Sequence, residues 1–142
     1  MGCGVPWRWP KMSSLNRRMN KLEKSVLVLG ASATAWRYSY MAAQLLLHKG
    51  YPTCLIGKSG GEVNDVPILK EIPNDFESVH TVTLYLNPAH QPQWEHEIEK
   101  LAPRRVIFNP GTENPDGMLR LEKQGIEVLE ACTLVLIKTA QF

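Results

Sequence analysis

The stretch Val26-Leu27-Val28-Leu29-Gly30-Ala31-Ser32 decides how this chain folds. An unbroken run of branched apolar residues is typical of a strand buried on both faces, as in a parallel sheet. The run ends at Gly30, where the absence of a Cβ lets the backbone approach a ligand closely. A helical pattern begins at about Ser39, and the start of a helix offers unpaired N–H groups to an anion. The stretch therefore predicts a strand, a turn and a helix start that together hold a phosphate group.

The same turn does not favour an NAD site. From Gly30 the chain reads Gly-Ala-Ser-Ala-Thr-Ala. The dinucleotide fingerprint G-x-G-x-x-G needs further glycines at positions where this chain has serine and alanine. The sequence thus indicates a nucleotide site without specifying a dinucleotide.

Charge divides the chain of 142 residues, which has the length of one domain, into two unequal parts. Residues 1–24 carry six basic side chains and one acidic, whereas residues 25–142 carry ten basic and thirteen acidic. The mildly acidic larger part argues against a nucleic-acid partner. Residues 1–19 show no sustained periodicity, so we expect a poorly ordered N-terminal extension at 1–19 and a folded domain at 20–142.

Membrane insertion and disulfide bonding are not expected. No apolar run approaches the roughly 18 residues that a membrane span requires. The cysteines Cys3, Cys54 and Cys132 show neither disulfide nor zinc-ligand spacing. Cys54 falls in a strand pattern and is expected to be a buried thiol. These features favour a cytoplasmic protein with no membrane partner.

Strand and helix patterns alternate along the rest of the chain. Strands are expected at 25–29, 53–56, 81–86, 105–108 and 126–129, and helices at 39–49, 91–101 and 115–123. A small hairpin or an irregular excursion is expected at 63–68, and a short helix within 131–142. This alternation predicts an α/β fold: a Rossmann-like, doubly wound sheet of about five parallel strands with helices on both faces. In such sheets the ligand lies beyond the carboxyl ends of the strands.

Turn-forming residues follow the strands at those ends, and several could contact a ligand. Ser32 and Thr34 offer hydroxyls to a phosphate, or else make only local turn bonds. Arg37 can fork onto a phosphate, or else form a surface ion pair. Ser39 is expected to be the N-cap of the first helix. Lys58 follows the second strand, where a lysine favours a ligand with an extra phosphate, although a solvated turn lysine explains it equally well.

Two further residues lie at the edge of the expected cleft. Tyr40 either packs over the cleft or covers the helix end. Asn109 borders a Pro-Gly turn, and turn formation alone can account for it.

A catalytic or metal-binding set is not recognisable in the sequence. The histidines His48, His80, His90 and His96 have no one-face helical spacing with further ligands. The nucleophile-elbow, P-loop and H-E-x-x-H motifs are absent. Cys132 is the one candidate nucleophile near the cleft, and the sequence assigns it no base. We therefore expect no catalytic residues, no metal and no enzymatic activity.

Several stretches together resemble a known family. These are Leu27–Ser32, the segment from Arg37 to Tyr40, His48-Lys49-Gly50-Tyr51, Leu84–Pro88, Phe108–Asn114 and Gly125–Val128. In this order they are similar to the small single-domain CoA-binding proteins, which resemble the CoA-binding domain of succinyl-CoA synthetase. The resemblance covers about residues 25 to 132. Many members have Asn-Pro after the second strand and Arg-Pro after the third, where this chain has Gly57-Lys58-Ser59 and Asn87-Pro88.

The resemblance implies a Rossmann-like domain that holds the ADP part of coenzyme A or an acyl-CoA, without implying catalysis. It implies that the turn at Gly30 and the helix start meet the diphosphate, that Lys58 lies near the ribose or adenine, and that residues after the third strand line the opposite wall. The cofactor-binding residues expected are Gly30, Ala31, Ser32, Thr34, Arg37, Ser39, Tyr40, Lys58, Tyr85, Asn87, Pro88 and Asn109.

Three functions remain open from the sequence. The leading hypothesis is a non-catalytic CoA carrier, sensor or accessory protein with a small-molecule nucleotide ligand. The second is an enzyme that depends on NAD(P) or CoA, for which Cys132 is the one candidate catalytic residue. The third is a protein-interaction module whose nucleotide cleft is vestigial.

Overall fold

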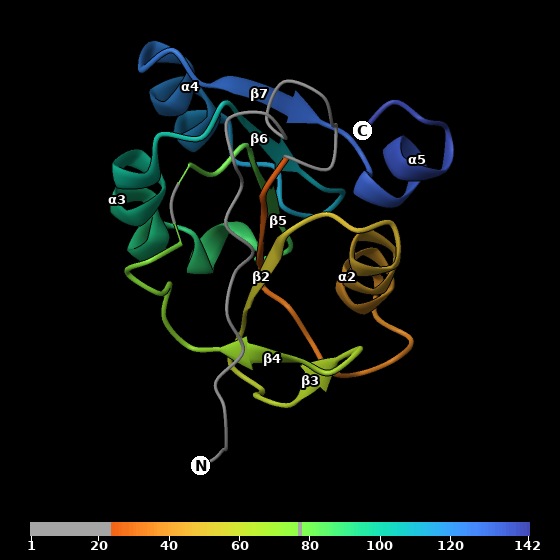
Figure 1. Cartoon of the computed structure of the whole chain (residues 1–142). Coiled ribbons are helices and arrows are strands. Elements are labelled where there is room, and N and C mark those ends of the chain that lie inside the picture. The colour runs from red at the N-terminus through yellow and green to blue at the C-terminus, as the bar shows by residue number, and fades with distance from the viewer. Residues whose placement is uncertain (1–23, 77) are drawn as a thin grey trace.

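The computed structural model describes residues 24–76 and 78–142, and these form one sheet with helices packed on it (Figure 1). The expected extension at 1–19 lies outside the described residues. The strands are β1 (Val26–Leu29), β2 (Thr53–Ile56), β3 (Glu62–Val63), β4 (Val66–Leu69), β5 (Thr81–Leu84), β6 (Arg105–Phe108) and β7 (Glu127–Glu130). The helices are α2 (Tyr38–His48), the 3-10 turn η2 (Pro88–His90), α3 (Pro92–Leu101), α4 (Pro115–Lys123) and α5 (Thr133–Lys138).

The expected count of about five strands is wrong, because the described residues form a seven-stranded sheet. The segment at 63–68 forms the small hairpin that the sequence suggested, with Asn64 and Asp65 both at positive φ in its turn. Its second arm, β4, extends the main sheet by pairing in parallel with β2. A proline within so short a run argues against a strand, so Pro67 makes β4 difficult to predict from the sequence.

The parallel strands have the order of a doubly wound dinucleotide-binding sheet. Across the sheet the order is β3-β4-β2-β1-β5-β6-β7, and all neighbours except β3 and β4 are parallel. Counted along the chain without β3, this is 3-2-1-4-5-6. The direction of winding reverses between β1 and β5, and a ligand site is expected at that point.

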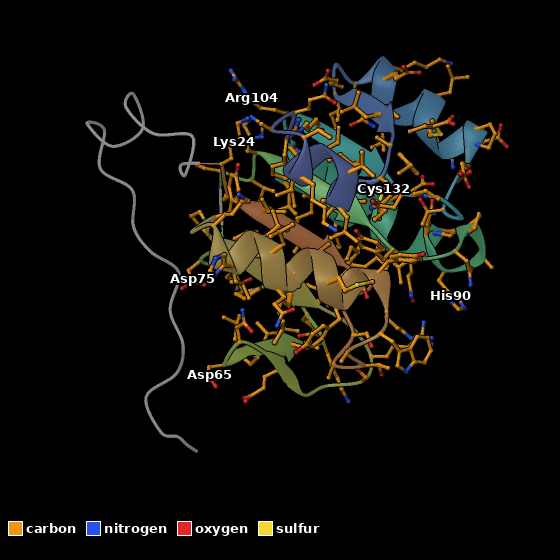
Figure 2. The ribbon with its side chains drawn as sticks, turned by 90° about the vertical axis from the view of Figure 1, so that its right-hand side faces the viewer. Lys24, Asp65, Asp75, His90, Arg104 and Cys132 are labelled. Carbon is orange, nitrogen blue, oxygen red and sulfur yellow. The ribbon has the colours of Figure 1, made fainter. Side chains whose placement is uncertain are left out.

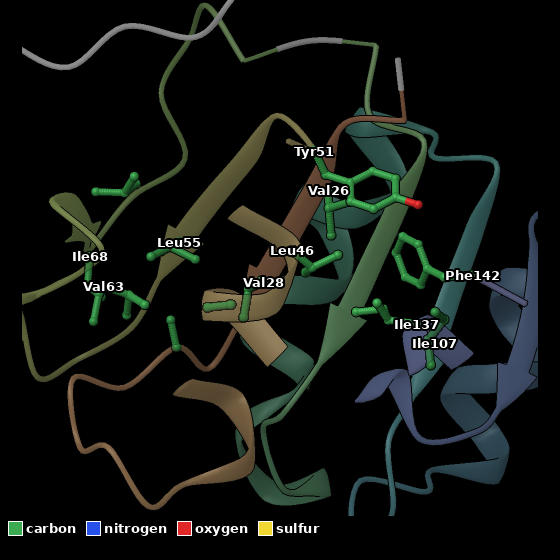
Figure 3. Close-up of a cluster of buried hydrophobic side chains, with 13 residues drawn as sticks. Val26, Val28, Leu46, Tyr51, Leu55, Val63, Ile68, Ile107, Ile137 and Phe142 are labelled. Atoms are coloured by element: carbon green, nitrogen blue, oxygen red, sulfur yellow. The ribbon is translucent and has the colours of Figure 1, made fainter. Parts of the chain in front are cut away.

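The core has two layers because successive side chains of a strand point to opposite faces. Val26 and Val28 of β1 belong to a cluster that α2 and α5 complete (Figure 3), whereas Leu27 and Leu29 belong to a cluster completed by α3 and α4. All four side chains are at most 1% exposed. Full burial of such a side chain contributes about 1.5–3 kcal/mol, so β1 anchors both layers. Helices on both faces are thus confirmed.

The start of α2 differs from the sequence prediction. The helix begins at Tyr38, and its N-cap residue is Arg37, in an extended conformation with no side-chain capping bond. The prediction of Ser39 as N-cap is therefore wrong. A turn closed by the Arg37 N–H on the Thr34 carbonyl (3.0 Å) brings the chain into the helix earlier, which buries Ser39 in the first turn. The short C-terminal helix, α5, is confirmed.

Candidate functional site

The two ends of the sheet carry different residues, and the candidate site lies at the carboxyl ends of the strands. Figure 2 shows Cys132 and His90, which follow β7 and β5, on the opposite side of the molecule from Lys24 and Arg104, which precede β1 and β6. The loops after β1, β2 and β5 meet there, beside the point where the winding reverses.

The turn after β1 is clamped between the ends of β2 and β5. The N–H groups of Gly30 and Ala31 both donate to the Ile56 carbonyl, at 2.9 and 2.8 Å. Gly30 has φ +102°, and a Cβ there would stand 2.9 Å from the carbonyl carbon of Tyr85. A side chain at Gly57 would collide with the carbonyl oxygen of Ala31. Both glycines are required because three loops approach one another at backbone distance.

The first turn of α2 presents open hydrogen-bond donors to this region. In residues 24–76 and 78–142, the backbone N–H groups of Tyr38, Ser39 and Tyr40 find no backbone or side-chain acceptor. Arg37 is exposed immediately before them. Unpaired N–H groups, the positive end of a helix dipole and a neighbouring cation all favour an anion.

The serine and threonine of the turn serve first as turn residues. Ser32 Oγ accepts the N–H of Thr34 at 3.0 Å, which is the local bond that the sequence left open as an alternative. Both side chains remain partly exposed. The Ser32 hydroxyl can still donate its own proton, so a phosphate contact stays a prediction for both residues.

Lys58 lies beyond β2, on the side of the turn away from β5. Its side chain is exposed. The same connection approaches the turn after β1, since a Cβ built on Gly61 would stand 2.8 Å from that of Ala33. The connection after β2 and the turn after β1 therefore lie side by side at the carboxyl ends of the strands.

Tyr85, Asn87 and Pro88, which were predicted to line the opposite side of the site, lie in the segment that follows β5. Asn87 Oδ1 accepts the Ala89 N–H at 3.0 Å and caps η2, while Pro88 is exposed. The Tyr85 hydroxyl oxygen is buried and makes no hydrogen bond of good geometry to any described residue, although the hydroxyls of Thr83 and Thr133 lie beside it. Burial raises the pKa of Tyr85 above its usual value.

Asn109 connects three elements inside the protein. Its side chain is 1% exposed. Its Nδ2 donates to Thr83 Oγ1 and to the Leu84 carbonyl, both at 2.7 Å, and its Oδ1 accepts the Thr133 N–H at 2.8 Å. These bonds join β5, β6 and α5. The amide is engaged within the fold, and a ligand contact by Asn109 stays a prediction.

Gln91 plays a part at this end of the sheet that the sequence did not indicate. It is 4% exposed, and its Nε2 donates to the carbonyls of Leu86 (2.9 Å) and Thr112 (2.7 Å). Its Oε1 accepts from Asn114 Nδ2 at 3.0 Å. The amide thereby fixes the loop after β5 to the loop after β6. A glutamine between a histidine and a proline carries no pattern that would reveal this role.

The cysteines and histidines form no recognisable acid–base pair in the described part of the chain. Cys54 is confirmed as buried, and burial raises its pKa further above the usual thiol range, with Asp75 adding to the effect. Cys132, the N-cap of α5, is partly exposed, and no described histidine or carboxylate is hydrogen-bonded to it. No three described metal-ligating side chains gather as a metal site would require.

Comparison with known proteins identifies the family. Residues 24–138 match the family model of the CoA binding domain. This chain belongs to the CoA binding domain family. The match spans the whole sheet and every loop at its carboxyl ends, so the family resemblance seen in the sequence is confirmed. No curated protein matches the chain.

Several solved structures resemble this chain. An uncharacterized protein shares 42% identity with a TM-score of 0.80, over 84% of this chain and 98% of its own. The cell-free protein ID.343 from Thermus thermophilus shares 23% (TM-score 0.74, covering 90% and 98%). A hypothetical protein from Pyrococcus horikoshii OT3 shares 19% (TM-score 0.73, 84% of each chain). The last two show likeness of fold alone.

No helix within 24–76 and 78–142 has the length and apolar character needed to cross a membrane.

Proposed function

We propose that this protein binds coenzyme A or an acyl-CoA through its ADP part, at the carboxyl ends of β1, β2 and β5. The observation that carries the proposal is the first turn of α2. Its open N–H groups stand beside Arg37, and the turn before them is clamped by close backbone contacts at Gly30 and Gly57. Open donors in a fixed position beside a cation suit a diphosphate.

The remaining contacts are part of the same proposal. The diphosphate lies on the N–H groups of residues 38–40, with Arg37 and the hydroxyls of Ser32 and Thr34 around it. Lys58, on the rim beyond β2, faces the ribose and its 3′-phosphate. Tyr85, Asn87 and Pro88 line the opposite side, along which the pantetheine arm extends.

We also propose that the protein acts without catalysis, as a carrier, sensor or accessory protein in the cytoplasm. Support comes from Cys132, the described cysteine nearest the cleft, which has no hydrogen-bonded acid or base among the described residues. Covalent catalysis by a thiol commonly depends on an adjacent general base. Transfer of an acyl group to the protein is therefore not expected.

A thermal-shift panel with CoA, acetyl-CoA, dephospho-CoA, NAD, NADP and ADP tests the ligand. A ligand at a hundred times its Kd stabilises the native state by about 2.7 kcal/mol. In a domain of this size that raises Tm by roughly 10 °C. We expect this rise with CoA and acetyl-CoA, a smaller one with dephospho-CoA and none with NAD. The absence of a shift with every compound would favour the interaction module instead.

Arg37→Ala tests the site. Loss of a charge-assisted contact to phosphate costs about 1.5–3 kcal/mol, so we expect CoA affinity to fall about 10- to 100-fold by calorimetry. Tm of the free protein should stay unchanged because Arg37 is exposed. Arg104→Ala is the matched control, since Arg104 is also exposed but lies at the other end of the sheet (Figure 2). Equal CoA affinity in both variants would remove Arg37 from the site.

A further inference from the structure

Two aromatic side chains beside the candidate site are unusually exposed. Trp36 is 75% exposed and Tyr38 is 70% exposed, more than any other large apolar side chain in the described part of the chain. They flank Arg37 at the start of α2. Water is an unfavourable environment for an indole ring, and covering the ring with an apolar or aromatic partner is favourable.

Trp36 belongs to a turn that is held by its own hydrogen bonds. The Thr34 N–H donates to Ser32 Oγ, and the Arg37 N–H donates to the Thr34 carbonyl, each at 3.0 Å. The Arg37 guanidinium carbon lies 5.4 Å from the centre of the Trp36 ring, within the range of a cation–π contact. The contact with Arg37 uses one face of the indole and leaves the other available.

The turn also lies on the side of the site where a nucleotide base is expected. Ala33 borders Gly61 in the connection after β2. In doubly wound sheets that bind nucleotides, the end of the second strand lies near the ribose. The open N–H groups that suit the diphosphate begin at Tyr38, two positions after Trp36. Along the chain, Trp36 therefore lies between Ala33, which borders the connection after β2, and the open N–H groups that begin at Tyr38.

We infer that Trp36 is the base-recognition residue of this site, and that its open face stacks on the adenine ring of the bound CoA. This inference rests on the proposed function. Stacking of a base on an aromatic side chain contributes about 1–3 kcal/mol and accepts any base, because every base has a π-face. Trp36 therefore supplies affinity for the adenine end of CoA, while Lys58 and the diphosphate contacts supply selectivity.

A protein partner is the other occupant that such a side chain could serve. The remaining exposed large apolar residues of the described chain are Leu119 and Val135, on α4 and α5. They belong to different helices from the Trp36–Tyr38 segment and do not extend it along its own element. The aromatic residues are instead grouped around the cation at the phosphate-binding turn, which favours a nucleotide.

The test uses ethenoadenine-CoA, a fluorescent CoA analogue whose base emission falls when it stacks on an indole. At saturating protein we expect strong quenching by the natural chain and recovery of emission with Trp36→Ala. Calorimetry should show CoA affinity reduced about tenfold in Trp36→Ala, in line with the loss of one stacked base. Trp36→Phe should retain most of the affinity, because it keeps an aromatic face.

Trp94→Phe is the matched control. Trp94 lies on α3 and packs against the core cluster of the opposite face, so its replacement should leave quenching and affinity unchanged. Full quenching and unchanged CoA affinity in Trp36→Ala would overturn the stacking inference and leave CoA binding intact. Failure of the natural chain to bind CoA at all would overturn the proposed function and this inference with it.

Discussion

The two ends of the sheet differ in whether their hydrogen-bond donors have partners within the protein. At the amino ends, the buried Arg105 donates through Nε to Thr81 Oγ1 at 2.7 Å and through Nη2 to the Phe142 carbonyl oxygen at 3.0 Å. Its guanidinium also stacks on the Phe142 ring, 4.6 Å from the centroid. At the carboxyl ends, the N–H groups of residues 38–40 stay open and Arg37 stays exposed.

This difference separates stability from binding. A hydrogen bond completed inside the protein stabilises the fold, and removing one partner leaves the other buried and unsatisfied. A donor left open at the surface adds little to stability but is available to a ligand. The same residue type, arginine, should therefore have a structural effect at position 105 and a binding effect at position 37.

The largest effect is expected from Arg105→Met, which keeps the apolar stem but removes all donors. The Thr81 hydroxyl and the Phe142 carbonyl oxygen each lose the Arg105 donor, although Lys24 Nζ still donates to Phe142 at 2.9 Å, and the cation–π contact is lost. We expect a decrease of about 3 kcal/mol in the free energy of unfolding. CoA affinity of the folded variant should not change. Urea unfolding and calorimetry measure the two quantities.

Arg104→Met provides the comparison for Arg105→Met, because Arg104 is its exposed neighbour in the chain. We expect a change within about 0.5 kcal/mol there. If both variants lost the same stability, the buried bonds of Arg105 would contribute nothing particular, and the contrast between the two ends would fail.

Gly57→Ala should affect both stability and binding, since Gly57 joins the end of β2 to the turn after β1. A methyl group there collides with the Ala31 carbonyl and approaches Ile68 Cγ2 at 3.2 Å. Overpacking of this kind costs about 1–3 kcal/mol. Moving the turn also displaces the donors of α2, so we expect CoA affinity to fall as well.

Gly60→Asn is the control for Gly57→Ala. Gly60 has φ +67° with no atom within 4 Å of a built Cβ, and asparagine tolerates that conformation. Stability should stay close to that of the natural chain. A Gly57→Ala protein that kept its CoA affinity would show that the turn after β1 need not be held by β2.

The elements that the sequence predicted correctly are those with local signals. Apolar runs ending in glycine mark β1 and β2, and Asn114-Pro115 with Gly125 brackets α4. The hairpin at 63–68 was suggested by the sequence, but the addition of its second strand, β4, to the main sheet was missed, because that depends on pairing with β2, which no local pattern encodes. Hydrophobic periodicity reports burial but not which strand lies alongside.

The candidate site likewise has features that contiguous residues predict and features that depend on residues far apart in the sequence. The order of strand, turn and helix start after β1 was predictable because Gly30, the small residues after it and the start of α2 are contiguous in the sequence. The engagement of Asn109 was not, because its partners Thr83 and Thr133 lie 26 and 24 residues away. A residue type at a strand end suggests a ligand contact, and only the folded chain shows that its atoms are already used.

The smallest effect is expected at His80, which lies beside the buried Arg105 at the amino ends of the strands. Its Nδ1 lies 2.8 Å from Thr81 Oγ1, the same oxygen that accepts Arg105 Nε–H. Burial lowers the pKa of His80 to about 4, and the nearby charges of Arg105, Lys24 and Arg104 add to this. The folded protein therefore keeps His80 neutral, whereas the unfolded chain protonates it near pH 6.5.

Below that pH the unfolded chain binds more protons, so stability must fall as pH decreases. The contribution of His80 is complete above about pH 6.5 and is lost progressively towards pH 4, amounting to less than about 1 kcal/mol because solvent screens a half-exposed ring. In urea titrations at pH 7 and 4.5, His80→Gln should lose less stability on acidification than the natural chain. His96→Gln, at an exposed position on α3, should follow the natural chain. Parallel pH profiles for His80→Gln and the natural chain would contradict this prediction. They would mean that His80 can be protonated beside Arg105 at no cost in stability, and that the hydrogen bonds of Arg105 do not require a neutral His80.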